Sequence, residues 1–167
     1  YDVFATLWYR DQRGEELAFS EPYIDCEIGL VKRADSGFRF GGLDSLRGQT
    51  VGVVEDYAYS KQAVDRTGID VRLTGSVRES VAALGSGDVD LVVADRRVAL
   101  LHINESALAK RFDVLPDALL TRGLRIAVPK ARPDHDEIIA AFDAAIEEMR
   151  RDGSYDALLA TYRISTW

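Results

Sequence analysis

Residues 84–95 read LGSGDVDLVVAD and join the end of one predicted helix to a strand and then to the start of the next helix. Gly85 and Gly87 are expected to stop the first helix, because glycine readily adopts the conformations that end helices. The strand DLVVA is apolar without alternation, which is typical of a strand covered on both faces in a parallel sheet. Asp95 follows this strand and begins the next helix, which it is well suited to cap.

The same alternation of strands and helices continues on both sides of this segment. It predicts an α/β fold with a mostly parallel sheet covered on both faces. Strands are expected at residues 2–7, 26–32, 50–54, 69–73, 90–94, 112–115 and 124–128. Helices are expected at 57–66 and from Asp95 to about Ile103. A further helix is expected to begin at Ser76, with Val77, Val81 and Leu84 on one face. The last two are expected to begin at Asp134, with Ile139, Phe142, Ile146 and Met149 on one face, and at Ser154, with Leu158 and Leu159 buried.

Three capping signals support these assignments. Ser76 with Glu79 forms a capping box, in which the serine hydroxyl and the glutamate carboxylate bond backbone amides of the first turn. Asp134 with Glu137 is a similar pair at the start of the penultimate helix. Asp44 is expected to cap a single helical turn just before the strand at 50–54.

The composition excludes several classes of function. The 167-residue chain is 47% hydrophobic and 29% charged, so it has enough apolar side chains for a core. Its formal net charge of -7 argues against nucleic acid as a partner, because phosphate backbones select basic surfaces. The single cysteine, Cys26, is interpreted as a buried apolar residue, and the spacing of His102 and His135 does not resemble a metal site. We therefore predict no metal and no cofactor.

Four motifs follow one another along the chain: R-x5-F-S-x-P-Y at 13–23, L-x-G-x-x-V-G-V at 46–53, L-x-x-G-x-V-D-x-x-V-x-D at 84–95, and DGSYDALLATY at 152–162. They occur in the same order in family 3 of the bacterial solute-binding proteins, the polar amino-acid group, and the chain resembles that family over almost its whole length. The resemblance implies a type II periplasmic-binding fold, in which two lobes are joined by two hinge strands. It places the hinge strands near 28–32 and 125–128, lobe 2 at 33–124, and parts of lobe 1 at 1–27 and 129–167.

The family's opening strands and helices have no counterpart in this sequence, which begins at Tyr1 inside a predicted strand. A truncated chain is the favoured interpretation, and a natural short relative that repacks is the alternative. An incomplete lobe 1 would expose apolar faces, at a cost of about 25 cal/mol for each Å2 left in water. We therefore expect self-association, domain swapping or a separate covering segment.

The resemblance implies that Arg13 binds the carboxylate of a solute, since a guanidinium offers parallel donors to two oxygens. The alternative is a surface arginine paired with Glu15 or Glu16. Thr6 and Trp8 match positions that line the lobe 1 side of the cleft in relatives. Trp8 is a less typical residue there, and packing against a neighbour is its alternative role.

Asp95 is the second main candidate, because ligand groups of open α/β sheets lie at the carboxyl ends of strands. In relatives the matching acid accepts hydrogen bonds from the amino group of the solute; helix capping is the alternative role. After the strand at 50–54, where relatives have glycine and hydroxyl residues, this chain has EDYAYS. Tyr57, Tyr59 and Ser60 are candidates to contact a different solute, or simply to pack.

The sequence therefore predicts an extracytoplasmic or periplasmic solute-binding protein that captures a small polar, amino-acid-like solute for an ABC transporter permease. A ligand-sensing input domain of a receptor is the first alternative, and a dehydratase of the same fold is the second. No catalytic residue is assigned, because no nucleophile lies in a recognisable pairing with a base.

Overall fold

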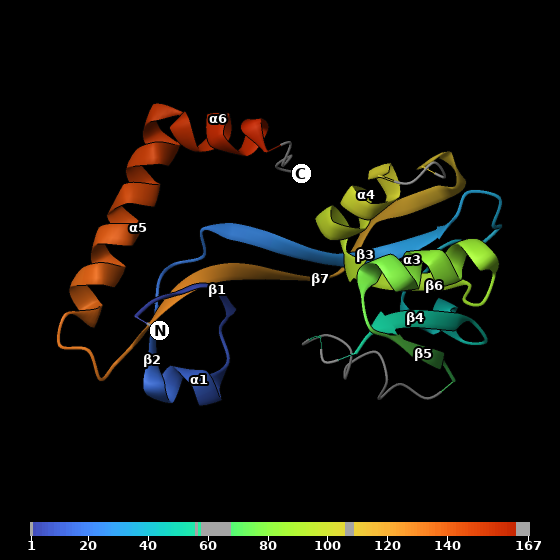
Figure 1. Cartoon of the computed structure of the whole chain (residues 1–167), viewed down its shortest axis with the longest axis horizontal. Helices are drawn as coiled ribbons and strands as arrows, with labels where there is room; N and C mark the ends of the chain where they lie inside the picture. Colours follow the sequence, from blue (N-terminus) through green and yellow to red (C-terminus); the bar gives the residue numbers. More distant parts are fainter. Residues whose placement is uncertain (1, 56, 58–67, 106–108, 163–167) are drawn as a thin grey trace. The chain divides into compact units, whose positions relative to one another are not determined.

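The computed structural model describes residues 2–55, 57, 68–105 and 109–162. The chain divides into two compact units, each described here by itself. Unit 1 combines Tyr1–Cys26 with Arg122–Trp167, and unit 2 is Glu27–Thr121. Two strands belong in part to each unit: β3 (Ile24–Arg33) and β7 (Phe112–Pro129) (Figure 1).

Unit 2 is built on a mixed sheet. Its parallel part consists of β4 (Thr50–Val54), β5 (Asp70–Thr74) and β6 (Leu91–Asp95), with β4 between the other two. Strand β3 joins the free side of β6 in antiparallel register, which gives the order β7-β3-β6-β4-β5. The described helices of this unit are α3 (Val77–Ser86), α4 (Arg96–Glu105) and the short 3-10 helices η1 (Leu43–Leu46) and η2 (Ala109–Arg111).

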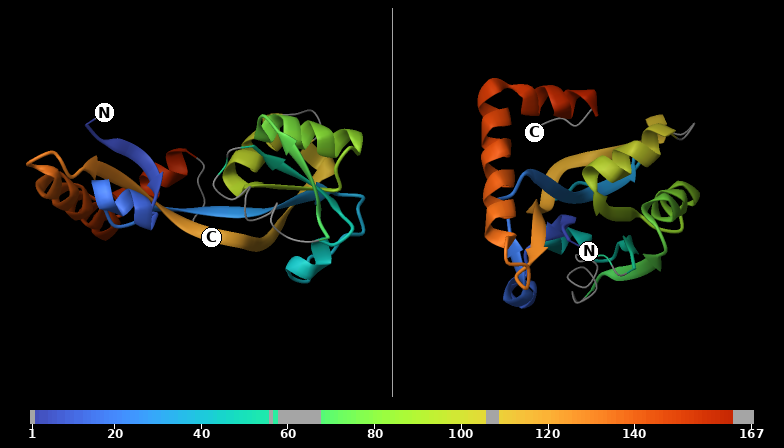
Figure 2. Two further views of the ribbon diagram at one scale, coloured as in Figure 1. Left: turned by 90° about the horizontal axis from the view of Figure 1, so that it is seen from below. Right: turned by 60° about the vertical axis from the view of Figure 1, so that its left-hand side comes forward.

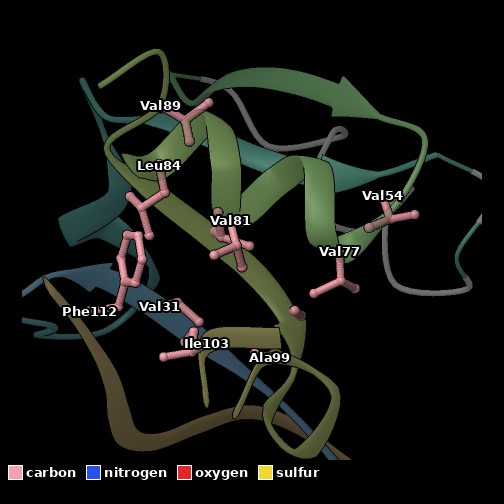
Figure 3. Packing of buried hydrophobic residues seen from close by; sticks show 11 residues of the cluster. Val31, Val54, Val77, Val81, Leu84, Val89, Ala99, Ile103 and Phe112 are labelled. Atoms are coloured by element: carbon pink, nitrogen blue, oxygen red, sulfur yellow. The ribbon is translucent and has the colours of Figure 1, made fainter. Parts of the chain in front are cut away.

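Helix α3 packs on this sheet as its sequence predicts. The Ser76 hydroxyl accepts a hydrogen bond from Glu79 N at 3.2 Å, and the helix ends at Gly87, whose φ of 84° is left-handed. The apolar face of α3 enters a core whose buried members come from α3, α4, four strands and the turn before β6 (Figure 3). They are Val31, Val54, Val77, Val81, Leu84, Val89, Val92, Ala94, Ala99, Ile103 and Phe112.

Unit 1 has two short strands, β1 (Phe4–Trp8) and β2 (Leu17–Phe19), each antiparallel to β7. Helix α1 (Asp11–Glu16) connects them. The last elements are α5 (His135–Asp152) and α6 (Ser154–Thr161), and α6 turns sharply away from the axis of α5 (Figure 2). No residue of α5 is buried, although its predicted apolar face is partly covered.

Ser20 links the end of β2 to β7. Its side chain is completely buried, and its hydroxyl accepts a hydrogen bond from Ile126 N at 3.1 Å while donating to Glu21 O at 2.8 Å. Cys26 is also buried, as predicted. Ser20, one of the residues in the motif at 13–23, therefore has a structural role, because its hydroxyl holds the end of β2 against β7.

Several details differ from the predictions. Strands predicted at 112–115 and 124–128 are parts of one continuous strand, β7, which lies between β1 and β3 in the sheet. The polar stretch before β2 forms α1, which was not predicted, and η1 begins after Gly42, so that Asp44 lies within it and pairs with Arg47 at 3.2 Å. The helix predicted at 57–66 falls almost wholly outside the described residues.

The caps of the last two helices also differ. Asp134 makes no side-chain capping bond; its carboxylate binds the Arg132 guanidinium instead, at 2.8 Å and 2.9 Å. Gly153 separates α5 from α6 as predicted, with a left-handed φ of 81°. Leu159 is buried but Leu158 is 45% exposed, because α6 presents only one of these two successive side chains to the rest of unit 1.

Candidate functional site

Three predicted binding residues lie close together in the sequence of unit 1, on β1 and α1. Trp8 ends β1 and pairs with Leu124 of β7. Arg13 lies on α1, where its Nη1 donates to the Trp8 carbonyl oxygen over 3.3 Å. The structure thus brings Trp8 and Arg13 into direct contact, and their contact with a solute stays a prediction.

Local backbone bonds explain how α1 positions Arg13. The amides of Arg13 and Gly14 both donate to the Arg10 carbonyl oxygen, at 2.9 Å and 3.0 Å, and turn the chain immediately after β1. Among the described residues, the Arg13 guanidinium forms no ion pair with Glu15 or Glu16. The surface ion pair considered as its alternative role is therefore absent from the described part of the chain.

Gly14 holds α1 close to its neighbours. A Cβ at this position would lie 2.9 Å from the Tyr9 hydroxyl oxygen, so the tyrosine ring occupies the space that a side chain would fill. Tyr9 also packs edge-on against Phe19 of β2, with 5.2 Å between the ring centroids. These contacts tie both ends of the segment that carries Arg13 to one another.

Thr6 is exposed and lies where the β1–β7 register is irregular, between Phe4 and Leu7. The Tyr23 hydroxyl donates to the neighbouring Ala5 carbonyl oxygen at 3.0 Å, which holds this irregular segment in place. Thr6 is therefore accessible on β1, and its role in binding stays a prediction.

A separate pocket in unit 1 lies beside α1, β2 and β7. It has a volume of about 460 Å3 and is lined by residues that include Tyr9, Gly14, Arg125 and Lys130. Both cations are already bonded to backbone oxygens: Lys130 Nζ to Gly14 O and Arg125 Nη1 to Ser20 O, each at 2.5 Å. Of the predicted binding residues that the structure describes, none lines this pocket.

In unit 2, Asp95 lies at the carboxyl end of β6, as predicted. Its Oδ1 accepts hydrogen bonds from Arg97 N at 2.8 Å and Val98 N at 3.1 Å, so the carboxylate caps α4. The parallel register that pairs Val53 with Val93 brings Glu55 level with Asp95 at the same edge of the sheet. The capping role is therefore present, and a solute contact would be additional to it.

Tyr57 follows this edge and is 47% exposed. Tyr59 and Ser60 lie outside the described residues, so their predicted contacts with a solute stay predictions. Glu55 and Asp95 give the described edge two acidic residues, and Glu55 stands where the sequence departs from the family pattern after β4.

Sequence reasoning missed two arginines beside these candidates. Arg96, in the first turn of α4, donates from Nη1 to Glu27 Oε2 at 2.6 Å, and both side chains are largely buried. Arg122 lies over the Trp8 ring, with Cζ 5.4 Å from the ring centroid. Neither belongs to a recognised motif. The register that places Arg122 on the same face of β7 as Leu124, the partner of Trp8, exists only in the folded chain.

The described residues contain no group of three or more histidine, cysteine, aspartate or glutamate side chains arranged to hold a metal ion. Among the same residues, no helix has the length and apolar character needed to cross a membrane.

Comparison with known proteins relates this chain to one protein family and to named relatives. A model of the family described as bacterial extracellular solute-binding proteins, family 3, matches residues 1–165. The lysine/arginine/ornithine-binding periplasmic protein of Escherichia coli strain K12 is 26% identical over 168 residues, which cover 96% of this chain and 63% of that protein. The L-cystine-binding protein TcyJ of the same strain is 29% identical over 150 residues, covering 89% and 54% respectively. The chain therefore spans less than two thirds of the length of these relatives.

Solved structures show the same fold. A crystal structure of the P235GK mutant of ArgBP from T. maritima matches with a TM-score of 0.78 at 26% identity, over 98% of this chain and 69% of that chain. A histidine kinase sensor domain with similarity to periplasmic binding proteins matches with a TM-score of 0.77 at 23% identity, over 96% and 68%. The second likeness concerns the fold alone.

Proposed function

This chain belongs to family 3 of the bacterial extracellular solute-binding proteins, and from that premise we propose that it captures a small, polar, amino-acid-like solute outside the cytoplasm for an ABC transporter permease. The relatives are named as binding proteins for lysine, arginine, ornithine, histidine or cystine. The chain is accordingly a binding protein and not an enzyme, and the dehydratase alternative is set aside.

In the proposed mechanism, unit 1 binds the solute through a positively charged side chain and unit 2 through a negatively charged one. Arg13 binds the carboxylate of the solute, with Thr6 and Trp8 beside it, and Asp95 accepts hydrogen bonds from the amino group. Unit 1 and unit 2 act as the two lobes, and β3 and β7 contain the hinge segments. Closure is favoured only to the extent that the solute gains contacts in the closed form that it lacks in the open form.

The observation that carries this proposal is the placement of Arg13. Its recorded side-chain bond uses Nη1 toward a neutral carbonyl, and within the described residues no carboxylate neutralises it. A guanidinium held by a backbone contact and not by an acidic partner is suited to receive a carboxylate from a ligand.

A sensory role is the second candidate, and the likeness to the histidine kinase sensor domain is the observation that favours it. Binding of the solute is common to both roles. They differ in the next step, which is delivery to a permease in one case and a change in receptor activity in the other. Self-association or domain swapping to cover the apolar faces of an incomplete lobe 1 also stays a prediction in either case.

A thermal-shift screen of the full-length gene product against amino acids and small organic acids tests the proposal. We expect at least one solute to raise the melting temperature in a concentration-dependent way, because a ligand that binds only the folded protein stabilises it. The solute should be recovered chemically unchanged after long incubation. Conversion of the solute, or the absence of any stabilising solute, would contradict the proposed function.

A further inference from the structure

Trp8 is flanked by two guanidinium groups in unit 1. Arg13 binds its carbonyl oxygen through Nη1 at 3.3 Å, and Arg122 lies over its ring with Cζ 5.4 Å from the centroid. The second contact has the geometry of a cation–π interaction. Because Trp8 pairs with Leu124, side chains two residues apart on β7 share its face of the sheet, and this places Arg122 beside the indole.

These two cations differ from the other partly buried arginines that the structure describes in the same unit. Arg132 is paired with Asp134 and Asp2, and Arg125 lies 3.8 Å from a carboxylate oxygen of Glu21. In the described part of the chain, neither Arg13 nor Arg122 has a carboxylate within ion-pair distance. Two half-buried cations therefore lie together without acidic partners in a protein whose net charge is -7.

We propose that Arg122 is a specificity-determining residue and that the solute carries two anionic groups, as an acidic amino acid does. This inference rests on the proposed function and adds the charge class of the solute. Arg13 binds one anionic group and Arg122 binds the other, while Trp8 supplies the apolar surface between them. The indole ring fixes the position of the Arg122 guanidinium, so little side-chain freedom remains to be lost when the solute binds.

The selectivity has an electrostatic reason: a solute with only one anionic group leaves one of the two guanidinium charges without a countercharge. A site with two adjacent guanidiniums brings like charges together, and a dianion offsets both. A solute that replaces one carboxylate by an amide leaves one guanidinium desolvated and poorly paired, which a site of this kind rejects. L-glutamate and L-glutamine differ in this respect and have almost the same shape.

The experiment compares the binding of these two probes by the full-length gene product carrying Trp167→Phe. Trp8 and Trp167 are the two tryptophans of this sequence, so the substitution leaves the fluorescence of Trp8 to report binding. Calorimetry supplies a second measure of affinity. We expect a preference for L-glutamate over L-glutamine of about tenfold or more, the ratio that one charge-assisted contact supports. Arg122→Gln should reduce this preference to about one, chiefly through weaker binding of L-glutamate, whereas Arg122→Lys should retain part of it. Arg151→Gln, an exposed change on α5, should leave the preference unaltered.

A structural role for Arg122 gives a different result. Loss of its packing on Trp8 would weaken the binding of both probes equally and leave their ratio unchanged, and that outcome would overturn the inference. Equal binding of both probes by the parent protein, or binding of neither, would also overturn it. In each of these cases, stabilisation by a neutral solute in the thermal-shift screen would leave the proposed function intact.

Discussion

The side chain of Arg96 crosses directly over Gly29: a Cβ at position 29 would lie 2.9 Å from Arg96 Cγ and 3.1 Å from Cδ. Gly29 lies on β3 opposite Ala94, next to the register pair of Ile28 with Asp95. Gly29 therefore leaves space for the buried side chain of Arg96, at the start of α4, to reach Glu27 on β3. This contact fixes the residue adjacent to Asp95, the proposed ligand group of unit 2.

Glu27→Gln is predicted to destabilise the protein while preserving its fold. The change removes a countercharge 2.6 Å from the Arg96 guanidinium, in a pair whose side chains are 9% and 19% exposed. We expect a loss of about 3 kcal/mol in the free energy of unfolding, near the lower end of the range for breaking a buried pair. Urea denaturation at neutral pH measures this loss of stability.

The double variant Glu27→Leu with Arg96→Met should recover much of the loss, because it removes both buried charges. An unchanged unfolding midpoint in Glu27→Gln would show that the ion pair contributes little.

Gly29→Ala tests the close approach between β3 and Arg96. The added methyl group would displace the arginine stem, which is held at its far end by Glu27, and overpacking of this kind costs about 1–3 kcal/mol. Gly37→Ala is a matched control, since nothing lies within 4 Å of its added Cβ. Thermal or urea unfolding should separate the two variants. If both were equally stable, Arg96 would have to be free to move.

Asp134 is predicted to make stability depend on pH. Hydrogen bonds from the Arg132 guanidinium hold the pKa of this carboxyl below its ordinary value. A depressed folded-state pKa stabilises the protein above the unfolded pKa, and this contribution is lost as the pH falls through the folded pKa. Asp134→Asn should therefore lower stability at neutral pH, and its difference from the parent should shrink in acid below the ordinary aspartate pKa. Melting curves across this range measure the effect, with exposed Glu148→Gln on the same helix as the control. A difference that stays constant with pH would contradict the assignment.

The sequence was most informative where one local signal had one structural consequence. The strand at 50–54, the capped helix at Ser76 and the break at Gly153 were all predicted correctly, because apolar runs, caps and glycine act over a few residues. Asp134 shows the limit of such signals: a nearby arginine competes for its carboxylate, and no cap forms. The continuity of β7 could not be read from local signals either, since this strand pairs with β1, β2 and β3, which lie far away in the sequence.

The candidate site was predictable only in part. Arg13 and Asp95 could be named because they lie in family motifs, and Trp8 because it matches a position that lines the cleft in relatives; the structure places Arg13 against Trp8. Glu27 and Arg122 could not, since their importance comes from partners 69 and 114 positions away that only the folded chain brings close. Tyr59 and Ser60 remain predictions.

The central claim is that Arg13 binds the carboxylate of the solute, and the affinity of Arg13→Ala for the best solute from the thermal-shift screen tests it most directly. Calorimetry on the full-length gene product should show a loss of roughly 10- to 100-fold, as expected for removal of a charged hydrogen-bonding partner. Arg10→Ala, on the same segment but exposed, should bind as the parent does. Affinity retained in a folded Arg13→Ala protein would contradict the claim.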